Sequence, residues 1–261
     1  MSLIAKYTYY ARSIVTLLTR FEDPLQILGI FLGGTGALPA QVRLRREGWR
    51  FQVREAMDVW VIKETCIDGD YLRDTALEPG WQVVDIGAGL GDFSVYAAAG
   101  CPEGVIHAYE PLAASFALLE HNLALNQATN VRPFRQATSG AAGRAQVAEG
   151  TAGPAVSTAF EATAGKRGVE TVSLAQVLER LPGSHCDLLK VDCEGCEYDL
   201  LLGSSPETLA KVQRISAETH EQAGGRSAAA LATFLSENGF QVTRRPNPVH
   251  DNLGFLYAKR A

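Results

Sequence analysis

A glycine-rich segment flanked by carboxylates has the residue types needed to hold a charged nucleoside. Residues 83–91 read Val-Val-Asp-Ile-Gly-Ala-Gly-Leu-Gly, so an apolar strand leads directly into a flexible loop. Its three glycines are Gly87, Gly89 and Gly91. Glycine lets a ligand approach the backbone closely and allows a positive φ. A strand, a glycine turn and a helix in succession form the place where open α/β sheets bind ligands.

The charge around this loop distinguishes two classes of cofactor. Dinucleotide sites follow G-x-G-x-x-G, and here Asp92 occupies the third glycine position. Asp85 and Asp92 would also place negative charge beside a pyrophosphate. S-adenosylmethionine (SAM) has no phosphate, and its methionine end carries an ammonium and a sulfonium that suit acidic surroundings. The pattern favours SAM over a nicotinamide dinucleotide, although Asp92 itself is interpreted more simply as a helix-start residue.

Another carboxylate, Glu110, follows the next predicted strand, 105–109. A carboxylate at that position can accept hydrogen bonds from both ribose hydroxyls of a nucleoside. A nicotinamide site would use the same feature. Glu110 therefore indicates a nucleoside-containing ligand without distinguishing the two cofactor classes.

Two later strands also end in ionisable side chains. The predicted strand 187–191 is followed by Asp192 and Glu194, and the predicted strand 212–218 ends at Glu218, shortly before His220. If these strands are neighbours, these four side chains meet the glycine loop at one sheet edge. In-line methyl transfer depends on positioning, and a hydroxyl acceptor must lose a proton, which a histidine can take near neutral pH. We expect His220 to be that base, with Asp192 or Glu218 orienting the imidazole or holding the acceptor hydroxyl.

Three of these side chains could instead bind a divalent cation. Mg²⁺ prefers carboxylate oxygens and water, so Asp192, Glu218 and His220 could contribute to such a site. Their spacing matches no dedicated metal motif. We therefore expect no metal, and a bound ion would take over proton removal from His220.

The elements that must position these residues alternate between strand and helix from Trp81 onward. The predicted strands are 81–86, 105–109, 131–137, 187–191, 212–218, 241–244 and 254–259, and the predicted helices are 93–99, 113–126, 174–181, one from 197, and 228–238. This alternation predicts a doubly wound α/β fold with a parallel sheet covered on both faces. Residues 138–168, rich in Gly, Ala and Thr, are expected to form an irregular hairpin or loop insertion.

An N-terminal extension, residues 1–78, precedes the predicted cofactor-binding domain, residues 79–261. Residues 1–20 are amphipathic, residues 42–53 alternate around a Glu-Gly turn like a β-hairpin, and residues 56–72 have a helical pattern. No segment reaches the roughly 18–20 apolar residues that span a bilayer. We expect the first helix to pack on the domain, with peripheral membrane association left open.

The composition of the chain indicates which binding partners and which cellular compartment to expect. The 261 residues carry a net charge of −5, which disfavours nucleic acid as a partner. Five cysteines without a secretory leader predict a reducing, cytoplasmic location with free thiols. The pair Cys193-x-x-Cys196 is expected to be buried filler and not a ligand set. The sequence leaves open a homo-oligomer.

Several segments together resemble the FkbM family of SAM-dependent methyltransferases. They are Asp85-Ile-Gly-Ala-Gly-Leu-Gly, Tyr109-Glu-Pro, Leu189-Lys-Val-Asp-Cys-Glu-Gly-Cys-Glu, Glu218-Thr-His and the upstream Asp58-Val-Trp-Val-Ile-Lys-Glu followed by Tyr71. The glycine loop occurs in many methyltransferases, whereas Lys-Val-Asp-x-Glu-Gly-x-Glu is the specific part. The resemblance covers roughly residues 40–261.

The resemblance implies a Rossmann-like class I methyltransferase sheet of seven strands, mostly parallel, with the last strand antiparallel. It implies O-methylation of a small-molecule hydroxyl, on a sugar or a polyketide-like natural product. It also implies that Gln136 and Ala137 flank the adenine. One departure is Gly89, where family members often carry asparagine. The candidate cofactor contacts are Asp85, Gly87, Gly89, Gly91, Glu110, Gln136, Ala137 and Asp192.

Two other functions compete with this one. A SAM-binding protein without turnover would need no base, so the Glu218 and His220 pair favours an enzyme. A nicotinamide-dependent dehydrogenase is disfavoured by Asp92. The pocket for the small-molecule acceptor is expected between the extension and the 138–168 insertion, and neither carries a motif that identifies the acceptor.

Overall fold

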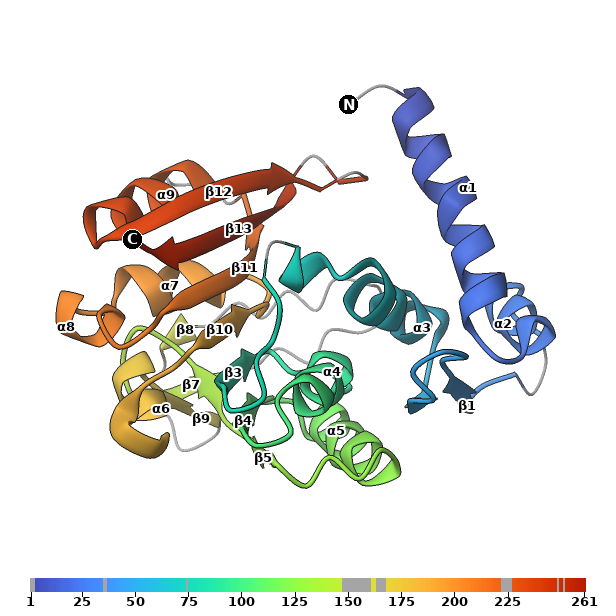
Figure 1. The fold of residues 1–261 in the computed structure, drawn as a ribbon, viewed down its shortest axis with the longest axis horizontal. Helices are drawn as coiled ribbons and strands as arrows, with labels where there is room; N and C mark the ends of the chain where they lie inside the picture. The colour runs from blue at the N-terminus through green and yellow to red at the C-terminus, as the bar shows by residue number, and fades with distance from the viewer. Residues whose placement is uncertain are drawn as a thin grey trace.

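A seven-stranded sheet forms the centre of this computed structural model (Figure 1). The structure describes residues 3–34, 37–73, 75–146, 161–162, 168–221, 227–247, 249–250 and 252–261. The strands of the sheet are β3 (Gln82–Ile86), β4 (Val105–Tyr109), β5 (Val131–Phe134), β10 (Leu188–Val191), β11 (Arg214–His220), β12 (Phe240–Pro246) and β13 (Leu253–Arg260). Their order is β12-β13-β11-β10-β3-β4-β5, and β13 is antiparallel to both of its neighbours. The expected sheet with a reversed last strand is confirmed.

Helices cover both faces of this sheet. The helices that contribute to the two core clusters beside the sheet are α4 (Asp92–Gly100), α5 (Ala113–Leu125), α6 (Leu174–Glu179), α7 (Cys196–Leu202), α8 (Pro206–Leu209) and α9 (Ala228–Glu237). Successive strand residues point to opposite faces, so Val83 joins the core cluster with α4 and α5, whereas Val84 joins the cluster with α6, α7 and α9. The doubly wound arrangement is thereby confirmed.

The N-terminal elements pack against α4 and α5, at the right of Figure 1. They are α1 (Leu3–Arg20), α2 (Pro24–Phe31), β1 (Ala40–Arg43), β2 (Arg50–Val53), α3 (Ala56–Ile62), a π-helical turn (Lys63–Asp68) and a 3₁₀ turn (Asp70–Leu72). The expected hairpin is the antiparallel pair β1 and β2. The amide of Asn122 on α5 joins this hairpin to the glycine loop, since it accepts from the N–H of Gln52 and donates to the carbonyl of Leu90.

The chain after β5 differs from the expectation. The strand predicted over 131–137 ends at Phe134, because the N–H of Gln136 turns back to the carbonyl of Phe134 at 2.9 Å. Where an irregular hairpin or loop insertion was expected, a second sheet forms with the strand order β6-β9-β7-β8, in which β7 and β8 pair antiparallel. These strands are β6 (Ala137–Thr138), β7 (Gly143–Gln146), β8 (Glu161–Ala162) and β9 (Val169–Val172). The remainder of the predicted insertion, 147–160 and 163–167, lies outside the described residues.

The length and apolar content of the described helices show whether any of them could span a membrane. None of them combines the length and apolar content that a bilayer-spanning helix requires.

A short 3₁₀ turn, Pro182–Ser184, and helix α8 were not expected from the sequence pattern.

Candidate functional site

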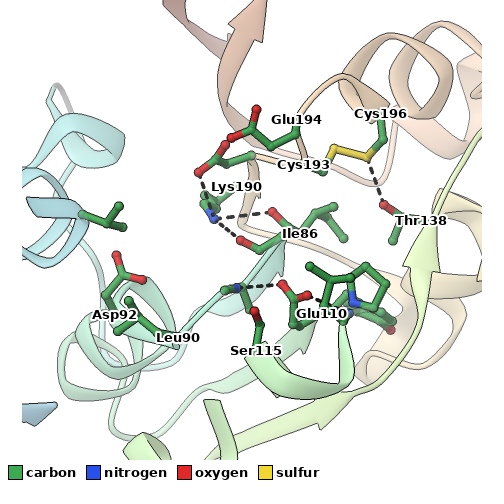
Figure 2. Close-up of a pocket in the computed structure, with 18 of the residues that line it drawn as sticks. Ile86, Leu90, Asp92, Glu110, Ser115, Thr138, Lys190, Cys193, Glu194 and Cys196 are labelled. Carbon is green, nitrogen blue, oxygen red and sulfur yellow. Dashed lines mark hydrogen bonds and ion pairs between the residues drawn. A yellow bond between two sulfur atoms is a disulfide. The ribbon is translucent and has the colours of Figure 1, made fainter. Parts of the chain in front are cut away.

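A crevice of about 230 Å³ opens at the carboxyl ends of β3, β4 and β10 (Figure 2). The strand order places these three strands side by side, so the glycine loop and the loops after β4 and β10 meet there. Six of the predicted site residues line the crevice: Gly87, Gly89, Glu110, Gln136, Ala137 and Asp192. The other four, Asp85, Gly91, Glu218 and His220, do not line the crevice.

Two of the glycines are required by the packing of the loop. Gly87 has φ of 71°, and a Cβ there would lie 1.7 Å from the carbonyl oxygen of Asp192. Gly91 has φ of 90°, precedes the first residue of α4, and would meet the side chain of Leu119 at 2.7 Å. Any side chain at either position would push the glycine loop away from its neighbours. Gly91 therefore shapes the loop without lining the crevice.

Glu110 lies at the floor of the crevice, where its carboxylate holds the loop (Figure 2). One oxygen accepts from the N–H of Gly89 at 3.0 Å, and the other accepts from the N–H of Leu112 at 2.8 Å. Burial raises the pKa of Glu110 to about 7, although these two N–H groups favour the ionised form. Each carboxylate oxygen can accept more than one hydrogen bond, so Glu110 keeps acceptor capacity for a ligand.

Asp85 differs from the expectation that it contacts the cofactor. Its side chain is fully buried, with one oxygen paired to the Lys190 ammonium at 3.0 Å. The other oxygen accepts from the hydroxyl of Ser94 on α4 at 2.6 Å. The reason is the register of β3 and β10, which places Asp85 directly beside Lys190. Asp85 therefore holds Lys190 and α4 in place and does not reach the crevice.

Lys190 is the cation that sequence reasoning missed. Its ammonium lines the crevice and donates to the carbonyls of Gly87 at 2.8 Å and Ile86 at 3.4 Å. Burial lowers the pKa of Lys190, but the charges of Asp85 and Asp192 outweigh that effect and raise it above its ordinary value. A lysine within the apolar strand Leu188–Val191 was the available signal, because a buried cation requires an anionic partner.

Asp192 projects into the crevice beside two further groups. The hydroxyl of Tyr71 donates to its carboxylate at 2.7 Å, and Tyr71 itself comes from the N-terminal extension. The Glu218 carboxyl also hydrogen-bonds Asp192, and burial together with the charge of Asp192 raises the pKa of Glu218 well above its usual range. The raised pKa favours the protonated form of Glu218 as the partner that donates to Asp192.

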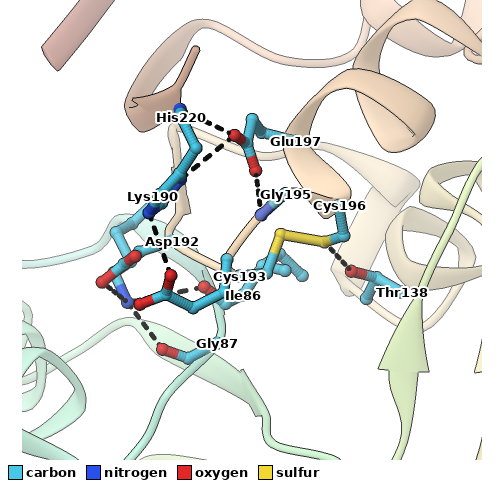
Figure 3. Close-up of a disulfide and its surroundings, with 11 residues drawn as sticks. Ile86, Gly87, Thr138, Lys190, Asp192, Cys193, Gly195, Cys196, Glu197 and His220 are labelled. Atoms are coloured by element: carbon cyan, nitrogen blue, oxygen red, sulfur yellow. Dashed lines mark hydrogen bonds and ion pairs between the residues drawn. A yellow bond between two sulfur atoms is a disulfide. The ribbon is translucent and has the colours of Figure 1, made fainter. Parts of the chain in front are cut away.

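His220 lies between two carboxylates on the loop and helix that follow β10 (Figure 3). Its Nε2 is 3.1 Å from Glu194, and its Nδ1 is 3.2 Å from Glu197. Burial lowers the pKa of His220, but the hydrogen bonds to Glu194 and Glu197 outweigh that effect and raise it to about 11. In this arrangement His220 is a cation with both nitrogens engaged, which does not fit the expected role of free base.

Glu197 explains why His220 is held so firmly. This glutamate is fully buried and accepts from the N–H of Gly195 at 2.8 Å and from the N–H of His220 at 3.0 Å. It thus joins the loop after β10 to the end of β11. Sequence reasoning named Glu197 only within a family motif and gave it no role.

Cys193 and Cys196 correct another expectation. They are joined by a disulfide, whereas Cys66, Cys101 and Cys186 are free and buried as expected (Figure 3). The Cα atoms of the joined pair are 5.4 Å apart, a separation that the C-x-x-C spacing at a helix start permits. Both cysteines line the crevice. The cross-link closes the loop that carries Glu194, a residue with φ of 53°, and so helps to hold Glu194 against His220.

The N-terminal extension supplies part of the crevice wall. Arg54, Asp58, Val61 and Thr65 line it from β2 to the π-helical turn. Arg54 pairs with Asp58 at 3.2 Å and donates to the hydroxyl of Ser115 on α5 at 3.3 Å, although Arg54 itself is exposed.

Gln136 marks the opposite end of the crevice, next to an aromatic stack. Its side-chain oxygen accepts from Arg180 at 2.6 Å, and that guanidinium lies 4.9 Å from the ring centre of Phe134. The rings of Phe134 and Tyr109 are stacked with their centroids 4.9 Å apart. These contacts fix the position of Gln136 at the edge of the sheet.

A metal centre is not evident from the geometry. Within the described ranges, no group of three or more His, Cys, Asp or Glu side chains is arranged to hold a metal ion. Both nitrogens of His220, the one nitrogen ligand that the sequence offered, already contact carboxylates.

The chain matches a family model and resembles named proteins over most of its length. The family described as "Methyltransferase FkbM domain" matches residues 85–242. The methyltransferase sdnD of Sordaria araneosa is 30% identical over 211 residues, covering 68% of this chain and 81% of that protein. The AMB antimetabolite synthetase AmbE of Pseudomonas aeruginosa is 30% identical over 228 residues, covering 71% of this chain but only 11% of that much longer protein.

The fold also resembles a solved structure, that of methyltransferase FkbM from Methylobacillus flagellatus KT. The TM-score is 0.50 at 13% identity, and the match covers 97% of this chain and 60% of that chain. Together with the sheet order, this likeness confirms the class I methyltransferase fold. The family match and the fold support SAM-dependent methylation, with SAM as the cofactor.

Proposed function

This chain belongs to the FkbM methyltransferase family, and from that premise we propose that it methylates a hydroxyl group of a small molecule, such as a sugar or a natural product. The observation that carries the proposal is the crevice itself. Its glycine loop leaves the backbone open to a ligand, and its ionisable groups include Glu110, Asp192 and Glu194. An acidic, glycine-lined crevice suits a cationic sulfonium nucleoside.

The proposed SAM contacts follow from the lining residues. Glu110 is positioned to accept from the ribose hydroxyls, because its carboxylate is fixed by the N–H groups of Gly89 and Leu112. Gly87 and Gly89 let the nucleoside approach the backbone, and Gln136 and Ala137 line the far end for the adenine. SAM supplies an activated methyl group on its sulfonium.

Asp192 is the group that we propose accepts the hydroxyl proton of the acceptor. It lines the crevice, whereas His220 lies behind it as a cation between Glu194 and Glu197. The hydroxyl of Tyr71 donates to the Asp192 carboxylate, and Glu218, whose pKa is raised by burial and by the charge of Asp192, is its second partner. With SAM bound, Asp192 would take the proton of the acceptor hydroxyl as the bond from oxygen to the methyl carbon forms and the sulfur–methyl bond breaks, which would leave a methyl ether and S-adenosylhomocysteine. His220 has the positioning role of fixing the loop around Asp192.

A small molecule is the acceptor class that we infer. Arg54, Asp58 and Tyr71 contribute polar groups from the extension, which gives the crevice a side wall outside the sheet edge. The printed name of the Pseudomonas relative, an antimetabolite synthetase, also points to small-molecule chemistry, although this chain spans 11% of it.

Calorimetry with S-adenosylhomocysteine tests the cofactor site. Glu110→Gln should weaken binding about ten- to a hundredfold, because hydrogen bonds to a charged acceptor contribute about 1.5–3 kcal/mol. The matched control is Glu103→Gln, which changes an exposed glutamate outside the crevice. Equal affinities for all three proteins would remove Glu110 from the cofactor site.

Methyl transfer from radiolabelled SAM tests the acceptor class. The protein is incubated separately with a panel of hydroxylated sugars and natural products and with bulk RNA. We expect label in the small-molecule fraction as an alkali-stable ether. Label confined to the RNA would contradict the proposal, and binding of SAM without any transfer would indicate a binding protein.

A further inference from the structure

Helix α1 presents an unpartnered apolar stripe to its surroundings. Tyr7, Ala11, Ile14, Val15 and Leu18 recur at helical spacing and therefore share one face, and all five are exposed. Tyr7 is 67% exposed and Val15 is 61% exposed, which is unusual for large apolar side chains on one face. Figure 1 shows α1 at the edge of the molecule, apart from the strands of the central sheet.

The opposite face of α1 anchors it to the protein. Leu17 is buried, and the hydroxyl of Tyr9 donates to Glu64 at 2.8 Å. The rings of Tyr9 and Tyr10 both contact Trp60 on α3, with centroids about 6 Å apart. The orientation of α1 is therefore set by its inner face, and the stripe points outward as a consequence.

Helix α2 extends the apolar surface. Asp23 caps this helix by accepting from the N–H groups of Leu25 and Gln26. Leu25 and Leu32 are 78% and 75% exposed, and Leu28 between them is also exposed. These three leucines are spaced at i, i+3 and i+7, so they too share one face. Helices α1 and α2 are in contact, so the two apolar faces belong to neighbouring helices.

Charge decides which partner fits this surface. Helix α1 contains Lys6, Arg12 and Arg20 and no acidic residue, although the whole chain has a net charge of −5. Arg20 pairs with Glu47 at 2.6 Å, whereas Arg12 is exposed beside the stripe. An apolar stripe with an exposed arginine beside it, on a helix that carries three cations and no acid, matches the boundary between acyl chains and anionic headgroups. A second copy of α1 would bring only like charges together across a two-fold axis.

We propose that α1 and α2 dock this protein onto an anionic lipid surface. The apolar stripe of α1 enters the acyl boundary, and Arg12 contacts the lipid phosphates and carboxylates. The helix lies in the plane of the interface and does not cross it, in agreement with its cations and its length. This binding is independent of methyl transfer.

Vesicle sedimentation of the full chain tests the proposal. Vesicles of phosphatidylcholine containing about one third phosphatidylserine should pellet the protein, and pure phosphatidylcholine should bind it several-fold more weakly. Ile14→Gln should lower the partition coefficient about tenfold, because one buried side chain is lost from the acyl region. The matched control is Leu202→Gln, which changes an exposed leucine on α7.

A charge variant provides a second, separate measurement. Arg12→Gln should lower binding to the anionic vesicles about fivefold and leave binding to pure phosphatidylcholine unchanged. The control is Arg244→Gln on β12, which is exposed and distant in sequence from α1. Unchanged circular dichroism and unchanged affinity for S-adenosylhomocysteine would show that each variant is folded.

Two results would overturn the proposal. One is the absence of binding to anionic vesicles by the folded wild-type chain. The other is sedimentation equilibrium showing a dimer that Ile14→Gln dissociates, with no vesicle binding, which would assign the stripe to self-association. Loss of methyl transfer with vesicle binding retained would concern only the proposed function.

Discussion

The affinity for the cofactor should depend on pH through Glu110. Burial raises its pKa to about 7 in the ligand-free protein, and the ionised carboxylate is the form that can accept from both ribose hydroxyls. Cofactor binding therefore favours the deprotonated form of Glu110. The cofactor should bind with its full affinity above pH 7 and more weakly as the pH falls below 7. Because the pKa is raised, this loss occurs near neutral pH and not near pH 4.5.

The size of the effect follows from the fraction of ionised Glu110. With a pKa of about 7, roughly one molecule in ten is ionised at about pH 6, and nearly all are ionised at about pH 8. The dissociation constant of S-adenosylhomocysteine should therefore be about tenfold larger at the lower pH.

Calorimetric titrations across this range, on the wild type and Glu110→Gln, are the assay. The wild type should lose affinity as the pH falls through 7, and the variant should bind weakly with no step there. The ligand contributes the same titration to both proteins, so it cancels in the comparison. A step near pH 7 that persists in Glu110→Gln, or a flat wild-type profile, would refute the assignment of both the pKa and the contact.

Three other outcomes follow from the buried charges. Lys190→Met should lower the free energy of unfolding by about 3–5 kcal/mol in urea titrations, because Asp85 remains buried without its cation. Asp192→Asn should reduce kcat at least a hundredfold with less effect on cofactor affinity if Asp192 accepts the proton, as steady-state kinetics and calorimetry can show. His220 should remain protonated up to about pH 11 in nitrogen-15 NMR of labelled histidine, because the pKa is raised by its two carboxylates.

Each of these expectations has a contrary result. Equal destabilisation by Lys211→Met, which changes an exposed lysine, would show that the loss is not caused by the buried pair. An Asp192→Asn variant with wild-type kcat would exclude proton acceptance by that carboxylate. Titration of His220 below pH 8 would show that the two ion pairs do not hold in solution, and would restore His220 as a candidate base.

Much of the fold was predictable because hydrophobic periodicity and the positions of turn-forming residues are local properties of the sequence. The strand and helix alternation gave the doubly wound sheet, and the boundaries of β4 and α4 were correct to within a residue or two. The second sheet was missed because its strands are short and pair across a long segment, β6 with β9 in parallel. The division at residues 78 and 79 stays a prediction, since the extension shares one core cluster with the sheet.

The sequence by itself determined that the glycine loop and two strand-end carboxylates gather at the crevice. Glycine spacing and strand-end carboxylates are local signals, and parallel strands bring their carboxyl ends to one edge, so Gly87, Glu110 and Asp192 all line it. Only the tertiary structure decided what each charge does. Register placed Lys190 beside Asp85, and the loop after β10 placed Glu194 and Glu197 around His220. Protonation depends on burial and on partners distant in the chain, which spacing along a sequence does not reveal.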